Sequence, residues 1–100
     1  MNDQIYNEIS DFMEDYKWYL NKEMTRETRI EEDFGITGDE AVEFLIKFGK
    51  HFNVDVSHFM ADEYFEPEGK MILFNFQRMK NKKVLTVGDL EKAIKLGYLI

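Results

Sequence analysis

The chain has 100 residues, a formal net charge of −7, 44% hydrophobic and 15% aromatic residues, and no cysteine. This length predicts one domain, residues 1–100, with enough apolar material for a single small core. The absence of cysteine excludes disulfides, thiolate metal sites and cysteine nucleophiles. We expect a cytoplasmic protein, because MNDQIYNEIS has neither the basic start nor the apolar run of a signal peptide and no stretch is long enough to span a membrane.

The charge is unevenly distributed. Residues 1–69 carry 18 acidic and 6 basic side chains, whereas residues 70–100 carry 2 and 7. An acidic body repels nucleic-acid phosphates and attracts a basic protein surface. The basic cluster Arg78–Lys83 lies near Phe74 and Phe76, a combination that can bind single-stranded nucleic acid. We favour the alternative of a polar hairpin turn with a lysine-protected strand edge, so nucleic acid is not an expected partner.

The first predicted helix spans residues 3–20. Its apolar residues recur at steps of three and four, which indicates one buried stripe: Ile5, Ile9, Phe12, Met13, Tyr16 and Leu20. A long polar loop, 21–36, follows. Four isolated apolar residues are expected to attach this loop to the core: Met24, Ile30, Phe34 and Ile36.

The second predicted helix spans about 38–52. Thr37 and Glu40 have the spacing of a capping box, and Asp39 adds negative charge to the first turn, where the helix dipole favours it. We expect its apolar face to be broad and to comprise Ala41, Val42, Leu45, Ile46, Phe48, Gly49 and Phe52.

The rest of the chain reads as a turn, a short helix after Ser57, an ambiguous segment and a final helix. Residues 71–85 read as a hairpin, with a short helix as the rival interpretation. The last helix begins at a second capping box, Thr86 with Asp89, and ends at Gly97, a residue suited to a left-handed C-terminal cap. The final residues YLI are apolar enough to dock on the core.

Three stretches in this order resemble acyl carrier proteins: EEDFG, HFNVDV and TVGDLEKAI, within residues 30–95. With YFEPEG and the insertion after it, the chain is most similar to a bacterial, mainly enteric, family of unknown function with an acyl-carrier-like fold. The resemblance implies a mainly α fold. The implied architecture is an acyl-carrier-protein-like four-helix bundle with a short β-hairpin or extended insertion before the last helix.

The same resemblance implies that the carrier chemistry is missing. The position of the serine that holds phosphopantetheine is Gly38, which offers no oxygen, and Asp39 stands where the family has a leucine. We therefore expect no cofactor and a non-enzymatic protein-interaction or regulatory domain. The alternative is a working carrier that uses Thr37 as a non-standard attachment residue.

Partner-binding residues are expected at the start of the second helix. In carrier proteins the acidic second helix docks partner enzymes, so the resemblance implies the same role for Asp39, Glu40 and Glu43. A protein partner, suited by a basic surface, is thus expected. Self-association, with the basic segment of one copy on the acidic helix of another, stays open as an alternative.

No metal site or catalytic group is expected. His51 and His58 lie seven residues apart with Asp55 and Asp62 nearby, but the turn NVDV separates them and a metal site needs several such groups to converge. The acidic residues near the second helix have no nucleophile beside them.

Overall fold

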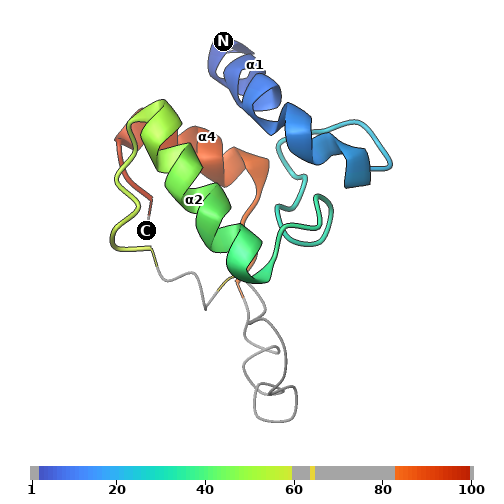
Figure 1. Cartoon of the computed structure of the whole chain (residues 1–100). Helices are drawn as coiled ribbons and strands as arrows, with labels where there is room; N and C mark the ends of the chain where they lie inside the picture. The colour runs from blue at the N-terminus through green and yellow to red at the C-terminus, as the bar shows by residue number, and fades with distance from the viewer. Residues whose placement is uncertain (1–2, 60–63, 65–82, 100) are drawn as a thin grey trace.

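The computed structural model describes residues 3–59, 64 and 83–99 (Figure 1). These residues form the α-helices α1 (Asp3–Phe12), α2 (Gly38–Phe52) and α4 (Val87–Leu96), with the 3-10 helix η1 (Met13–Tyr19) continuing α1. Within the described ranges there are two isolated β-bridges and no sheet. The prediction of a mainly helical chain is confirmed, whereas the described residues do not show a four-helix bundle.

Two predicted elements lie mostly outside the described residues: the short helix after Ser57 and segment 71–85. Ser57 lies within the described residues. Its hydroxyl and its backbone N–H both donate to Asp55 Oδ1, at 2.7 and 2.9 Å, which closes a local turn.

The predicted first helix, 3–20, is helical from Asp3 to Tyr19 and ends at the extended residue Leu20, and the backbone tightens at Met13 from α to 3-10 geometry. Its apolar stripe faces the core as expected, with Ile9 and Met13 fully buried. The ring of Phe12 packs against Phe44 and Phe48 of α2, with centroids 5.9 and 6.2 Å apart. This aromatic contact holds the α1–η1 junction over α2.

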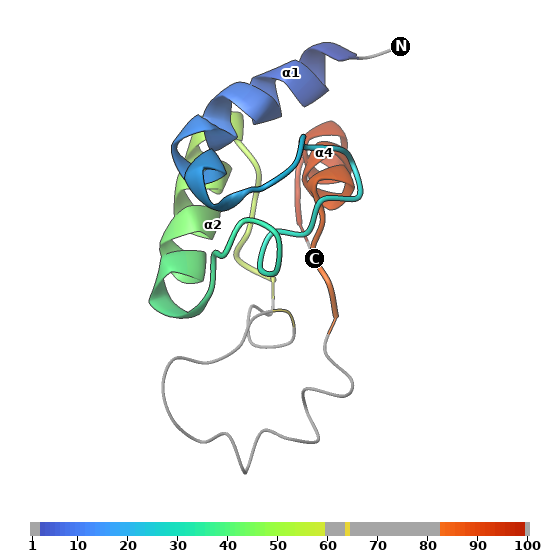
Figure 2. The ribbon, with the colours of Figure 1, turned by 90° about the vertical axis from the view of Figure 1, so that its right-hand side faces the viewer.

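The helices α2 and α4 enclose the core from two sides. Figure 2 shows α2 on one side and α4 on the other, with α1 across their top and the first loop running between them. The loop is attached as predicted, because Met24, Ile30, Phe34 and Ile36 are all buried. The loop therefore serves as a layer of the core.

The start of α4 pairs with this loop, a contact that the sequence did not predict. The Ile30 N–H donates to the Leu85 carbonyl and the Val87 N–H donates to the Thr28 carbonyl, both at 2.9 Å. Arg29 and Thr86 form an antiparallel bridge between these bonds. Residues at the end of the predicted hairpin thus pair with the first loop.

An ion pair reinforces the same connection. Arg26 donates from Nε and Nη2 to the two carboxylate oxygens of Glu91, at 2.7 and 3.2 Å. The guanidinium carbon also lies 4.8 Å from the ring centroid of Tyr6. Glu91 is buried, so this contact joins α1, the first loop and α4 at one point.

The helix caps differ in one respect from the prediction. The Thr86–Asp89 capping box is present, and Gly97 ends α4 at φ 92°. Asp55 receives the tail, since its N–H donates to Gly97 and its carbonyl accepts from Leu99. The predicted Thr37–Glu40 capping box is wrong: Thr37 is the N-cap residue of α2, but its side chain makes no capping hydrogen bond.

Candidate functional site

The acidic start of α2 forms an exposed surface. Asp39 and Glu40 lie in the first turn and Glu43 one turn later, and all three are exposed. Successive residues of an α-helix are about 100° apart, so residues three and four apart share a face. The face that carries Asp39 and Glu43 therefore also carries Val42 and Ile46, while Glu40 lies at its edge.

Val42 and Ile46 were expected in the core, and the structure corrects this. Each is 48% exposed. The buried stripe of α2 consists instead of Ala41, Phe44, Leu45 and Phe48, a row at steps of three and four. Val42 and Ile46 are each one residue beyond members of this row, which turns them toward solvent.

We call the exposed set Asp39, Val42, Glu43 and Ile46 the α2 face. It combines two aliphatic side chains with two carboxylates on a rigid helix. Exposed large apolar residues that share one face are more informative than single ones, because grouped patches are typical of interaction sites. The predicted partner-binding residues Asp39 and Glu43 thus lie beside apolar neighbours.

Tyr16 of η1 packs against helix α2. The ring of Tyr16 meets that of Phe44 edge-on at 5.4 Å. Burial raises the pKa of Tyr16, and the negative charges of Glu40, Asp15 and Glu43 raise it further.

Trp18 and Tyr19 end η1 on the surface. Trp18 is 81% exposed and packs edge-on against Tyr19 with centroids 5.5 Å apart. A Cβ atom on Gly35 would lie 2.8 Å from the Tyr19 ring, so the ring covers that glycine. Trp18 is therefore a surface residue and lies outside the buried stripe of the first helix.

Thr37 and Gly38 connect the first loop to α2. The Thr37 hydroxyl donates to Glu31 Oε2 at 2.5 Å, which explains why it does not cap the helix. Gly38 begins α2 at φ 61°, a left-handed conformation that a residue with a Cβ adopts at a cost of about 1–2 kcal/mol. The backbone itself therefore favours glycine at this position.

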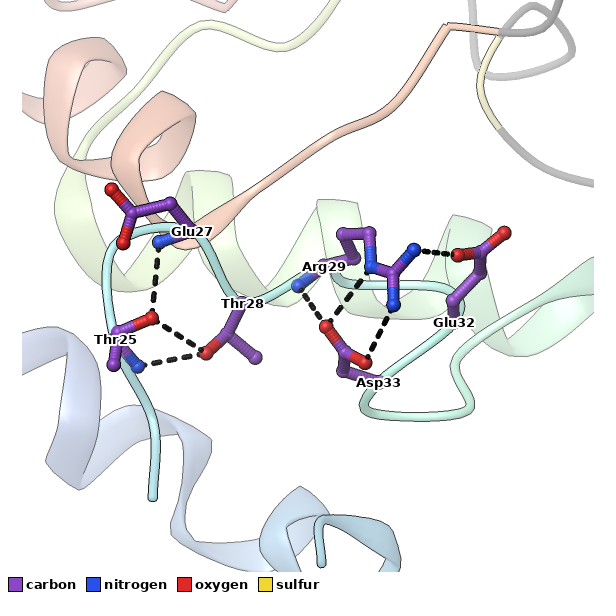
Figure 3. A network of polar contacts seen from close by, with 6 residues as sticks. All are labelled: Thr25, Glu27, Thr28, Arg29, Glu32 and Asp33. Atoms are coloured by element: carbon purple, nitrogen blue, oxygen red, sulfur yellow. Dashed lines mark hydrogen bonds and ion pairs between the residues drawn. The ribbon is translucent and has the colours of Figure 1, made fainter. Parts of the chain in front are cut away.

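The carboxylates that precede α2 are engaged in a local network (Figure 3). Arg29 donates from Nε and Nη2 to Asp33, at 3.1 and 3.2 Å, and forms an ion pair with Glu32. The Arg29 hydrogen bond holds the pKa of Asp33 below its ordinary value. Asp33 is thus a structural residue of the first loop.

The remaining predicted groups form no further site in the described part of the chain. No set of three or more His, Cys, Asp or Glu residues there could hold a metal ion. Of the basic cluster 78–83, only Lys83 is described. None of the helices in the described ranges is long and apolar enough to cross a membrane.

Comparison with known proteins adds one finding. Residues 1–99 match the family described as "Protein of unknown function (DUF1493)". The chain belongs to this family. No curated protein and no solved structure matches the chain.

The family assignment corrects the resemblance to acyl carrier proteins. The matching family is one of unknown function, and no acyl carrier protein is among the matches. The three stretches EEDFG, HFNVDV and TVGDLEKAI are each short, and their order alone does not specify a family. The alternative of a phosphopantetheine arm on Thr37 depended on the same resemblance and loses that support.

Only the exposed geometry of α2 now supports the predicted partner-binding residues. The signal missed in the sequence is the second apolar row of α2, Val42 with Ile46, which lies on the same face as the predicted acidic residues. The i, i+4 spacing of Val42 and Ile46 is visible in the sequence, but we assigned both residues to the core. In the structure, both side chains belong to the exposed surface of α2.

Proposed function

We propose that this member of the DUF1493 family is a non-enzymatic protein-binding domain and that the α2 face is its docking surface. The observation that carries the proposal is the pairing of exposed Val42 and Ile46 with Asp39 and Glu43 on one helical face. Aliphatic side chains supply buried area on binding, and the carboxylates around them select a partner of opposite charge.

The partner that fits this face presents basic residues around an apolar patch. Attraction between the acidic body and such a partner speeds their encounter, because charge complementarity raises association rates. A helix is also a suitable platform: its backbone is already ordered, so little conformational entropy is lost on binding.

The titratable groups support a binding role over catalysis. Hydrogen bonds within the fold account for the lowered pKa values of three carboxylates: Arg29 acts on Asp33, Ser57 on Asp55 and Arg26 on Glu91. Each of these carboxylates already has a structural partner. The carboxylates of the α2 face are exposed, as expected for groups that meet another protein.

Charge reversal tests the proposal. The variant Asp39→Lys/Glu43→Lys should lose most of the proteins that the wild type captures from its native cell, because like charges then oppose a basic partner. The variant Val42→Ser/Ile46→Ser should lose the same proteins, since it removes the apolar contact. Captured proteins are quantified by mass spectrometry, and far-UV circular dichroism verifies that each variant is folded.

A matched control separates this effect from net charge. Glu8→Lys/Asp11→Lys makes the same change in charge on exposed positions of α1. This control should retain the captured proteins. Equal capture by the wild type and both α2-face variants would contradict the proposal.

A further inference from the structure

A second group of exposed apolar residues surrounds the C-terminal end of α4. Val84, Leu96 and Tyr98 are 54, 53 and 44% exposed. They line a groove of about 470 Å³. We call this the α4 groove; its other lining residues are Tyr64, Lys83, Leu85, Asp89, Lys92, Ala93 and Leu99.

The groove is lined by the segment before α4, by α4 itself and by the tail after it, together with Tyr64. Pairing with the first loop fixes Leu85 beside the start of α4, and the left-handed cap at Gly97 reverses the chain. The bridge between Asp55 and Tyr98 then holds the tail in place. As a result, Leu85, Ala93 and Leu99 form a buried floor below exposed apolar walls.

The charges of the α4 groove are opposite to those of the α2 face. Lys83 and Lys92 are exposed at the groove, with Asp89 as the one carboxylate among the lining residues that the structure describes. The Lys83 ammonium lies 5.8 Å from the ring centroid of Tyr64, so it is held near the groove wall. The groove is thus apolar with a basic border, the chemistry that suits an acidic and aliphatic helix.

We propose that the α4 groove of one copy receives the α2 face of a second copy. This inference rests on the proposed function and names the partner as another molecule of the same chain. In the proposed contact, Val42 and Ile46 of one copy contact Val84, Leu96 and Tyr98 of the other. The carboxylates of Asp39 and Glu43 lie beside Lys83 and Lys92.

The two surfaces cannot meet within one molecule. Figure 2 shows that α2 and α4 lie on opposite sides of the core. The contact is therefore heterologous: each copy offers one face and one groove, so copies add head to tail and form either a ring or a chain. The net charge of −7 opposes association at long range. At about 0.15 M salt the screening length is about 8 Å, so that repulsion weakens while contacts between adjacent charges persist.

Charge exchange tests this pairing by sedimentation velocity at about 0.15 M salt. The wild type should sediment faster as its concentration rises. Asp39→Lys/Glu43→Lys reverses the face and Lys83→Glu/Lys92→Glu reverses the groove. Each should weaken association by about tenfold or more, because like charges then face each other. The control Glu8→Lys/Asp11→Lys should associate like the wild type.

Mixing the two reversed variants gives the decisive result. The groove variant keeps an intact face and the face variant keeps an intact groove, and the reversed face also complements the reversed groove, so the mixture should associate in alternation although neither variant associates by itself. A chain that carries all four substitutions should regain self-association. A monomeric wild type at its highest soluble concentration would overturn the inference, and so would a mixture that stays monomeric.

These outcomes are distinguishable from failure of the proposed function. A monomeric wild type that still captures other proteins through the α2 face would remove the second copy as the partner and leave the docking surface intact.

Discussion

Gly49 illustrates how one residue limits the packing of α2. A Cβ atom at this position would lie 2.8 Å from the Val54 carbonyl oxygen and 3.4 Å from the methyl groups of Val56. The chain after α2 therefore folds back directly onto this glycine. Its role is to permit close approach, since its φ is not left-handed.

The variant Gly49→Ala is expected to lower the free energy of unfolding by about 1–3 kcal/mol, because the added methyl group meets backbone atoms that must shift. Helix propensity alone predicts a gain of about 0.8–1 kcal/mol, so the two effects have opposite signs. Urea denaturation measures the result. The neighbouring control Lys50→Ala, at an exposed position, should stay within about 0.5 kcal/mol of the wild type. A more stable Gly49→Ala protein would show that the segment after α2 is not held against the helix.

Glu91 links stability to pH. Its hydrogen bond with Arg26 lowers the pKa of the carboxyl group below its ordinary value of 4.5, although burial acts in the opposite direction. The pKa of the Glu91 carboxyl is lower in the folded state than in the unfolded state. The stabilisation by the Arg26–Glu91 pair is therefore present above the unfolded-state pKa and is lost as the pH falls toward the folded-state pKa.

The variant Glu91→Gln should therefore lose less stability than the wild type between about pH 5 and about pH 3. At neutral pH it should be less stable by about 1.5–3 kcal/mol, the range for a hydrogen bond to a charged group. Thermal unfolding across this pH range measures both effects. The exposed control Glu27→Gln should follow the wild type, whose remaining slope includes Asp33 and Asp55. Parallel curves for Glu91→Gln and wild type would rule out this linkage.

At the scale of elements, the two threonine caps allow a direct comparison. Thr86 accepts from the Asp89 N–H and completes a capping box, whereas the Thr37 side chain binds Glu31 and caps nothing. We expect Thr86→Ala to cost about 1 kcal/mol, the usual value for removing an N-cap.

The variant Thr37→Ala should cost less than Thr86→Ala, because it removes an exposed hydrogen bond and no capping interaction. Chemical denaturation of both variants measures the difference. If Thr37→Ala proved the more costly change, the Thr37 hydroxyl would be capping α2 in solution.

The elements also show where sequence patterns were sufficient. The bounds of α2, the capping box of α4 and the buried loop residues followed from spacing and cap chemistry, since these depend on local interactions. Which face of α2 is buried did not follow from the sequence. Its sequence AVEFLIKF contains two apolar rows at helical spacing, and only the tertiary contacts of Phe44 and Phe48 select which row is buried.

At the scale of the whole molecule, two features, the long-range pairing of α4 and the family of the chain, required information that local sequence patterns did not contain. The pairing of Leu85–Val87 with the first loop joins segments more than fifty residues apart, and no local pattern specifies it. The family resemblance depended on short stretches in a common order, and the match to the DUF1493 family replaces it. The acidic residues of the α2 face were predicted by position, but the apolar residues beside them were not.

The central claim is that the α2 face contacts another protein molecule. A photoreactive amino acid placed at Ile46 in the native cell tests it, with the same group at Glu8 of α1 as the matched control. We expect covalent protein adducts at Ile46 and few or none at Glu8, because only the former lies within the proposed contact. Equal labelling at both positions, or labelling at Glu8 alone, would contradict the claim.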